Sequence, residues 1–224
     1  TLVIKSNDPQ NPTVNAHIYL DKNGAPTVEA TKSTVYAKEG AETVVPVVVY
    51  DQEGDAFTVK FDDKLGAVSV KNYSNDNETQ DGVTVIEDGT YKVEAGLGVQ
   101  FKVALNPDYG TAGTHVFTIT AVDANGNEVV KDVNYTVEHV NRAPQFVGPS
   151  ELSLKTGETS AQYSFSDLFE DADGDEMTYS VEIENGGLAT IYKSEDGIII
   201  AAKQTAGNTH VNLKATDANG ASTT

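Results

Sequence analysis

The densest cluster of charge in the sequence is a run of acidic residues in its second half. Five carboxylates fall within seven residues, namely Glu170, Asp171, Asp173, Asp175 and Glu176. Packed into one turn, these carboxylates repel one another. A hard cation relieves that repulsion, and calcium prefers about six to eight oxygen ligands. The sequence therefore predicts a calcium site in this turn.

A solvated surface turn is the alternative explanation of the same residues. Asp173 and Gly174 form an Asp-Gly pair, which is ordinary hairpin sequence. The helix-loop-helix calcium pattern is not met, because Gly174 falls at the wrong position. The first half of the chain holds a weaker counterpart of the acidic run, in Asp51, Glu53 and Asp55.

Catalytic motifs are missing from the sequence. The four histidines lie in strand-like or linker segments and form no zinc-binding pair on a helix; they are His17, His115, His139 and His210. There is no nucleophile elbow, phosphate loop or dinucleotide fingerprint. A glycosidase carboxylate pair needs a sugar cleft, which stacking aromatics usually line, and the chain has no Trp. We expect no catalysis.

Charge and composition exclude several classes of partner. Acidic residues outnumber basic ones by 34 to 15 over 224 residues, which gives a net charge of -19. Such a field repels nucleic acid and anionic membrane surfaces. No apolar run approaches the roughly 18 residues that cross a bilayer, so we expect no direct membrane insertion. The absence of Cys excludes disulfides and thiolate metal sites.

Alternating hydrophobicity and frequent turns predict the fold class. Asn-Gly and Asp-Gly pairs recur between short runs of β-branched and aromatic residues, which is the pattern of many hairpins. Phe117, Ile119 and Ala121 fall on one face of a predicted strand, and Val133 and Tyr135 fall on one face of the next. Strands with one dry face are typical of antiparallel sandwiches. We predict an all-β chain of antiparallel β-sandwiches.

An internal similarity divides the chain. Residues 111–126 align without gaps with residues 205–220, and both segments end in Asp-Ala-Asn-Gly. We therefore predict two sandwiches in tandem, residues 25–140 and residues 143–224. Because the first is longer between its shared motifs, it is predicted to carry an insertion at about residues 72–95. Pro144 fixes its own backbone angle, so the connection is expected to be short and stiff.

The two ends of the chain suggest unpaired strands. Residues 1–22 look like a terminal hairpin that belongs to a preceding immunoglobulin-like module, whereas the second sandwich lacks its last strand. The simpler interpretation is a fragment of a longer string of modules. The alternative is a homo-oligomer formed by strand exchange, in which the hairpin of one molecule pairs with the open edge of another.

Three short motifs together resemble a known family. Residues 141–146 (NRAPQF), 169–180 (FEDADGDEMTYS) and 215–220 (ATDANG) are similar, in that order, to motifs of bacterial cadherin-like domains of the dystroglycan type. The resemblance covers residues 143–224 well and residues 25–140 more loosely. The opening segment resembles the end of an immunoglobulin-like module. The fold implied is a tandem of immunoglobulin-like or cadherin-like sandwiches in a bacterial surface or secreted protein.

The resemblance also implies roles for individual residues. In cadherins a D-x-D pair and a later aspartate bind calcium beside the linker, which here implies Asp171, Asp173 and Asp217, with Asn141 from the linker. The sequence departs from that pattern, because Arg142 places a positive charge where cadherins carry further acids.

These observations predict a non-catalytic extracellular spacer or adhesion segment, with a protein or a glycan on a cell surface as its partner. Calcium bound at the boundary between the two modules is expected to stiffen the segment. Two alternatives stay open. One is an accessory region of a secreted hydrolase such as a protease. The other is a carbohydrate-binding module, for which Tyr73 and Tyr109 would supply an exposed platform.

Overall fold

The chain is built almost entirely of β-strands, which confirms the predicted fold class. A computed structural model describes residues 2–5, 7, 9–10, 13–16, 23–30 and 34–224. The chain divides into two compact units, Thr1–His139 and Val140–Thr224. Among the described residues, no helix is long and apolar enough to cross a membrane.

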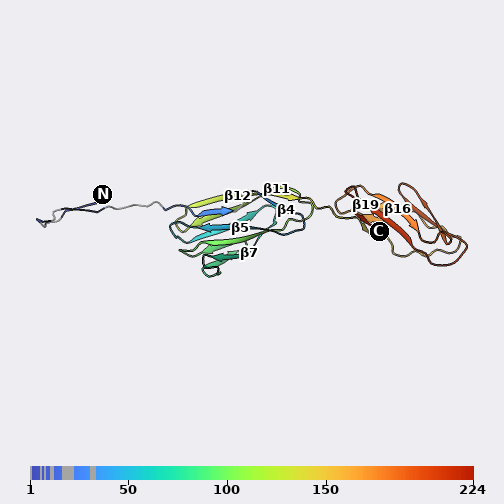
Figure 1. The fold of residues 1–224 in the computed structure, drawn as a ribbon, viewed down its shortest axis with the longest axis horizontal. Helices are drawn as coiled ribbons and strands as arrows, with labels where there is room; N and C mark the ends of the chain where they lie inside the picture. Colours follow the sequence, from blue (N-terminus) through green and yellow to red (C-terminus); the bar gives the residue numbers. More distant parts are fainter. Residues whose placement is uncertain (1, 6, 8, 11–12, 17–22, 31–33) are drawn as a thin grey trace. The chain divides into compact units, whose positions relative to one another are not determined.

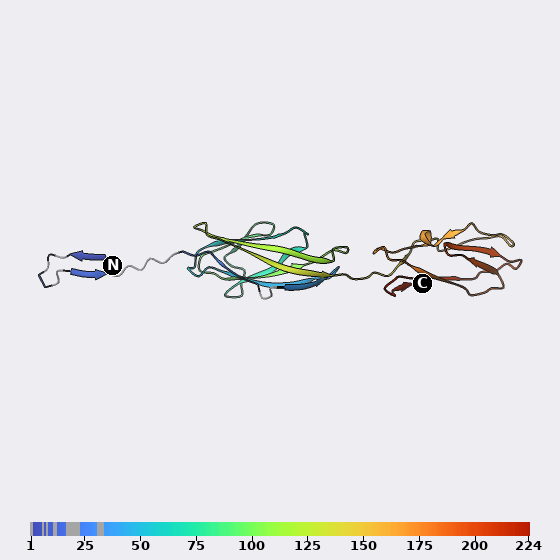
Figure 2. The ribbon, with the colours of Figure 1, turned by 90° about the horizontal axis from the view of Figure 1, so that it is seen from above.

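The first unit contains twelve described strands: β1 (Leu2–Lys5), β2 (Thr13–Ala16), β3 (Thr27–Ala30), β4 (Thr34–Lys38), β5 (Thr43–Tyr50), β6 (Phe57–Asp63), β7 (Val68–Asn75), β8 (Val83–Glu87), β9 (Thr90–Val93), β10 (Val99–Leu105), β11 (Gly113–Asp123) and β12 (Glu128–Glu138). Strands β1 and β2 pair with each other as an antiparallel hairpin (Figure 2). Residues 1, 6, 8, 11–12 and 17–22 of the predicted terminal hairpin lie outside the described residues.

Two sheets form the sandwich of the first unit (Figure 1). One has the strand order β3-β5-β10-β7, and the other has the order β4-β12-β11-β6-β9-β8. All pairs are antiparallel except β4 with β12, which is parallel. The alternation predicted for β11 and β12 is confirmed, because Phe117, Ile119, Ala121, Val133 and Tyr135 are all fully buried.

Aromatic rings fill one part of this core. Phe61 lies edge-on to Phe101 with their centroids 5.1 Å apart, and Tyr91 is 5.3 Å from Phe101. Tyr73 packs against the same group, 5.3 Å from Tyr91. Tyr73 is therefore partly buried against the core and is less exposed than a sugar platform shared with Tyr109 would require; the carbohydrate-binding alternative stays a prediction.

The region predicted as an insertion forms a hairpin. Strands β8 and β9 pair with each other, and β9 pairs with β6, so the hairpin extends the larger sheet. Before it, Asn75 organises the polar turn: its Oδ1 accepts hydrogen bonds from the backbone nitrogens of Asn77 and Thr79. The turn is consequently held by its own side chains and is not an extended loop.

The second unit has eight strands and one helical turn: β13 (Gln145–Phe146), β14 (Tyr163–Ser164), α1 (Phe165–Leu168), β15 (Phe169–Glu170), β16 (Thr178–Ile183), β17 (Ala189–Lys193), β18 (Gly197–Ala202), β19 (Val211–Thr216) and β20 (Ser222–Thr223).

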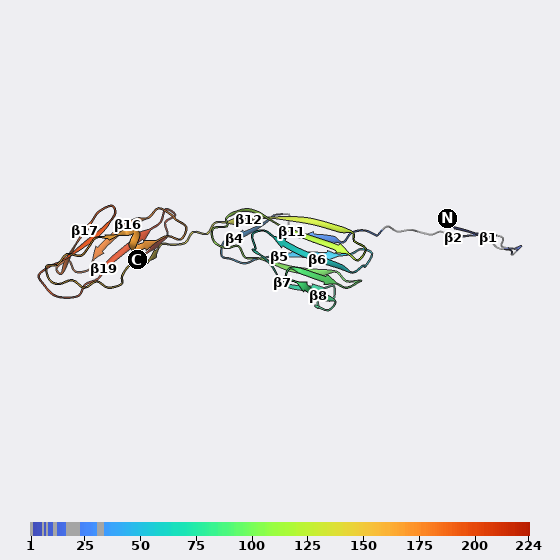
Figure 3. The ribbon, with the colours of Figure 1, turned by 180° about the vertical axis from the view of Figure 1, so that it is seen from behind.

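Short sheets surround a small core in this unit. Their strand orders are β13-β15, β14-β18-β17 and β16-β19-β20, and Figure 3 shows β16 beside β19. One cluster of buried hydrophobic residues forms the core, namely Phe165, Leu168, Phe169, Ile198 and Ala215. Tyr179 stacks flat on Phe165 with centroids 4.2 Å apart. Strand β20 pairs only with the last two residues of β19, Ala215 and Thr216.

Candidate functional site

The acidic turn of the second unit is organised around Asp171. Its Oδ1 accepts backbone hydrogen bonds from Asp173 at 2.8 Å and from Asp175 at 3.3 Å. Gly174 makes the turn possible, because its φ of +76° lies in the left-handed region that disfavours other residues. An aspartate that caps its own following residues is a common turn device.

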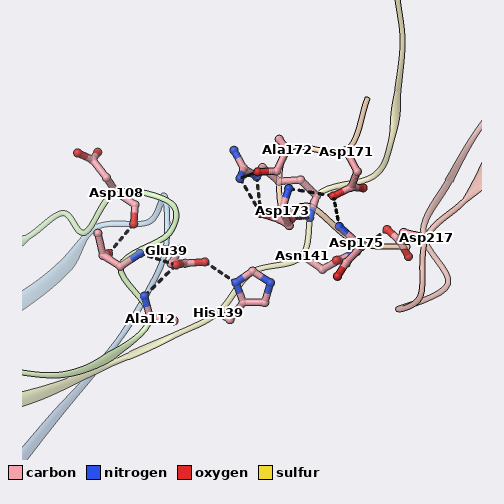
Figure 4. Close-up of polar contacts among 12 residues, drawn as sticks. Glu39, Asp108, Ala112, His139, Asn141, Asp171, Ala172, Asp173, Asp175 and Asp217 are labelled. Carbon is pink, nitrogen blue, oxygen red and sulfur yellow. Dashed lines mark hydrogen bonds and ion pairs between the residues drawn. The ribbon is translucent and has the colours of Figure 1, made fainter. Parts of the chain in front are cut away.

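Asp217 forms a second turn that lies against the first residues of the unit. Its Oδ1 accepts the backbone N–H groups of Asn219 at 2.9 Å and Ala221 at 2.8 Å, and its Oδ2 accepts the side-chain amide of Asn141 at 2.8 Å (Figure 4). Asp217 is buried. The hydrogen bond from Asn141 is the main cause that holds the pKa of Asp217 below its usual value, and the turn amides add to it.

Asn219 joins the two turns. Its side-chain amide nitrogen donates to Asp175 Oδ2 at 2.6 Å and to Asn141 Oδ1 at 2.9 Å. The five residues that the sequence proposed as metal ligands, Asp171, Asp173, Asp175, Asp217 and Asn141, therefore do lie in one cluster. Asn219, which the proposal left out, bridges them.

The arrangement inside the cluster differs from a cation cavity. Among the residues that the structure describes, no three His, Asp or Glu side chains are placed to hold one metal ion. Arg142 binds Asp173, and both oxygens of Asp217 accept hydrogen bonds. As placed, these residues do not fit a calcium ion. Calcium binding by them stays a prediction.

The first unit contains the same hydrogen-bonded frame. Asp51 Oδ1 accepts the backbone N–H groups of Glu53 and Asp55, both at 3.0 Å. Asn125 donates its side-chain amide to Asp55 Oδ2 at 2.8 Å, as Asn219 does to Asp175. Asn23 donates to Asp123 at 2.7 Å, as Asn141 does to Asp217.

Asn23 was missed at the sequence level, although a signal was present. Residues 23–26 read Asn-Gly-Ala-Pro and residues 141–144 read Asn-Arg-Ala-Pro, so the two segments share Asn, Ala and Pro at the same spacing. Burial raises the pKa of Asp123, and hydrogen bonds from the side chain and backbone of Asn127, the backbone of Asn125 and the side chain of Asn23 outweigh it. The pKa of Asp123 is therefore lowered.

One oxygen in each acidic turn is buried without a hydrogen-bond partner among the described residues. These two atoms are Asp51 Oδ2 and Asp171 Oδ2. They occupy the same place in the two turns, since the Oδ1 of each residue caps the turn that follows. A buried carboxylate oxygen without a donor is unfavourable. Each turn thus holds one unsatisfied acceptor.

A separate network lies at the end of the first unit. Glu39, whose side chain is fully buried, accepts the backbone N–H groups of Thr111 and Ala112 on Oε1, both at 2.9 Å. Its Oε2 lies 2.8 Å from Nδ1 of His139 (Figure 4). The contact ties the last residue of this unit to the turn after β4.

The two remaining described histidines contact neighbouring backbone or carboxylate oxygens. His115 Nε2 lies 2.7 Å from the backbone oxygen of Thr111, and its ring packs on Tyr135. His210 lies on the exposed Glu184, and its hydrogen bond lowers the pKa of that carboxyl. His17 lies outside the described residues.

No family model matches the chain, and no curated protein matches it. The chain is similar in fold to immunoglobulin-like and cadherin-like β-sandwich domains. Nothing in the comparisons supports the narrower dystroglycan type.

Three solved structures illustrate the likeness. The protocadherin gamma-B4 extracellular domain is 20% identical, with a TM-score of 0.43 over 91% of this chain and 33% of that one. The titin immunoglobulin tandem domains are 15% identical, with a TM-score of 0.31 over 91% and 94%. An endo-fucoidan hydrolase of glycoside hydrolase family 107 is 19% identical, with a TM-score of 0.35; the alignment covers 94% of this chain and 29% of the hydrolase.

Proposed function

We propose that the chain is a non-catalytic spacer segment of an extracellular or cell-surface protein. Two β-sandwich units in one chain, without a catalytic arrangement among the described residues, support this role. The extracellular placement rests on the resemblance of the loop motifs to those of surface-protein modules. Adhesion to a protein or glycan is a narrower form of the same proposal.

The observation that carries the proposal is that the residues on either side of Val140 are hydrogen-bonded within their own units. His139 contacts the buried Glu39 of the first unit at 2.8 Å. Asn141 and Arg142 donate to Asp217 and Asp173 of the second unit. Only Val140 separates His139 from Asn141 along the chain. A connection this short supports a stiff spacer, because few backbone angles remain to vary.

Pulsed dipolar spectroscopy tests the stiffness directly. The chain has no Cys, so Lys92→Cys in the first unit and Glu182→Cys in the second give two unique spin-label sites on exposed strand positions. We expect a narrow distribution of the distance between the labels. The control is the same pair with a four-residue Gly-Ser insertion after Val140, which should broaden the distribution. Equal widths for the two proteins would contradict the spacer proposal.

Calcium stiffening does not enter this proposal. Calcium at Asp171, Asp173, Asp175, Asp217 and Asn141 is a prediction from the sequence, and the spacer role stands without it. The two ideas are tested separately, because the width of the distance distribution can be measured with and without a chelator.

A further inference from the structure

The only arginine in the sequence is Arg142, and it lies in the acidic cluster of the second unit. Its Nε and Nη2 atoms donate to Asp173 Oδ1 at 2.9 and 2.6 Å, and its backbone nitrogen donates to Asp173 Oδ2 at 2.7 Å. Nη2 also donates to the backbone oxygen of Ala172 at 2.7 Å. One residue thus supplies four hydrogen bonds to the turn.

Burial makes this ion pair different from the other Lys and Arg pairs described in the chain. The Asp173 side chain is 6% exposed and the Arg142 side chain is 34% exposed. By contrast, Lys60 and Asp62 are 52% and 71% exposed and lie 3.6 Å apart. Exposed pairs contribute little to stability, whereas a buried carboxylate that loses its cation is costly. The guanidinium stays charged at every ordinary pH, so this neutralisation is permanent.

The first unit shows what the frame is like without an arginine. Gly24 follows Asn23 there as Arg142 follows Asn141, and Glu53 holds the place of Asp173. A Cβ atom added to Gly24 would lie 3.5 Å from Glu53 Oε2. The Glu53 carboxylate therefore lies near the backbone of Gly24, as the Asp173 carboxylate lies near the backbone of Arg142. The first acidic turn is capped by Asp51 as the second is by Asp171, and Asn125 and Asn23 donate to Asp55 and Asp123 as their counterparts do in the second unit. The guanidinium is therefore an addition to a shared frame and not a requirement for building it.

We propose that Arg142 is a built-in cation of the second unit. Its guanidinium takes the part that a divalent ion would play in an acidic turn of this kind, neutralising Asp173 and holding the turn closed against the first residues of the unit. The turn is consequently held without added metal. This inference does not rest on the spacer role, and either can fail alone.

Selective labelling with ¹⁵N-arginine tests the proposal on the full chain, since a single arginine gives one backbone signal and one Nε–H signal. We expect an Nε–H signal that persists at neutral pH and does not move when millimolar calcium is added or removed with EDTA. Asp173→Asn should broaden that signal, whereas Asp62→Asn, in the exposed pair of the first unit, should leave it unchanged.

Calcium that shifts the Arg142 signals in a saturable way would overturn the proposal, because the ion would then be displacing the guanidinium. An Nε–H signal equally broad in the wild type and in Asp173→Asn would overturn it too.

Hydrogen exchange gives a second readout. The backbone N–H groups of Asp173 and Asp175 donate to Asp171 Oδ1. In Arg142→Gln their protection from hydrogen exchange should fall about tenfold, the size expected for the loss of hydrogen bonds to a charged group. The Asp55 amide of the first unit should not change, and Lys60→Gln should alter none of these amides. Unchanged protection of Asp173 in Arg142→Gln would contradict the proposal.

Discussion

The side-chain amide of Asn141 donates to the carboxylate of Asp217 at 2.8 Å and so ties the first residues of the second unit to the turn between β19 and β20. This bond is the main reason that the pKa of Asp217 is lowered. A carboxyl whose pKa is lower in the folded than in the unfolded chain stabilises the fold above its ordinary pKa, and the contribution is lost as the pH falls through the folded value.

Asn141→Ala should therefore raise the pKa of Asp217 towards its ordinary value and move the acid unfolding of the second unit to higher pH. The carboxyl ¹³C shift of Asp217 followed through an acid titration measures the first effect, and circular dichroism measures the second. Asn212→Ala, at an exposed position of β19, is the matched control and should change neither. An Asp217 pKa that is the same in Asn141→Ala and in the wild type would contradict the assignment.

A second prediction concerns Glu39, whose buried carboxylate accepts hydrogen bonds from two backbone N–H groups and contacts His139. Glu39→Ala leaves the N–H groups of Thr111 and Ala112 without their acceptor, and we expect a loss of about 3 kcal/mol in the free energy of unfolding of the first unit. His139→Ala removes one contact from a side chain that is 48% exposed and should cost less than about 1 kcal/mol. Urea unfolding of both variants measures the difference, and equal losses would show that the amides do not depend on Glu39.

The sequence predicts local features of this fold better than its long-range contacts. The alternation of Phe117, Ile119 and Ala121 identifies a buried face, because strand periodicity depends only on neighbouring residues. The bond from Asn125 to Asp55 joins residues 70 positions apart, and no local pattern encodes it. The positive charge of Arg142 is visible in the sequence. Which of the nearby acidic residues it pairs with depends on the conformation of the folded turn, which places Asp173 next to it.

The burial of Glu39 is a second feature that the local sequence does not predict. Between Lys38 and Gly40 it reads as an exposed turn residue, because acidic side chains are rarely buried. Its burial follows from the amides of Thr111 and Ala112, which belong to a loop more than 70 residues later. Tyr73 likewise reads as a candidate platform until Tyr91 and Phe101 are known to lie beside it.

Tyr135 makes a prediction at alkaline pH. Its hydroxyl is buried and donates to Asp63 Oδ1 at 3.1 Å, and burial, followed by the charge of Asp63 and this hydrogen bond, raises its pKa far above the ordinary value of 10.0. A group whose pKa is raised on folding contributes stability below its unfolded pKa, and the contribution is lost as the pH rises towards the folded value. The free energy of unfolding of the first unit should accordingly fall as the pH rises above about 10.

Tyr135→Phe should reduce that alkaline slope and should cost about 1 kcal/mol at neutral pH, where the lost hydroxyl leaves Asp63 with one donor fewer. Denaturant unfolding at a series of pH values measures both effects. Tyr36→Phe is the control, because Tyr36 is 67% exposed and should affect neither. A slope that Tyr135→Phe does not change would exclude Tyr135 as its source.

Gly40 and Gly66 separate backbone strain from steric contact in the first unit. Both have left-handed φ angles, +66° and +74°. A Cβ atom at Gly66 would meet nothing within 4 Å, whereas one at Gly40 would lie 2.7 Å from the ring of Tyr109. Gly66→Ala should cost about 1 kcal/mol from the backbone alone, and Gly40→Ala should cost about 1 kcal/mol more because the ring must move.

Thermal unfolding of the two variants measures this difference, which corresponds to a shift of about 4 °C in Tm for a unit of this size. In a Tyr109→Ala background the excess cost of Gly40→Ala should disappear, because the atoms that the new methyl group meets are gone; a double-mutant cycle isolates that term. If Gly40→Ala and Gly66→Ala have the same Tm in the presence of Tyr109, the ring does not rest on Gly40 in solution.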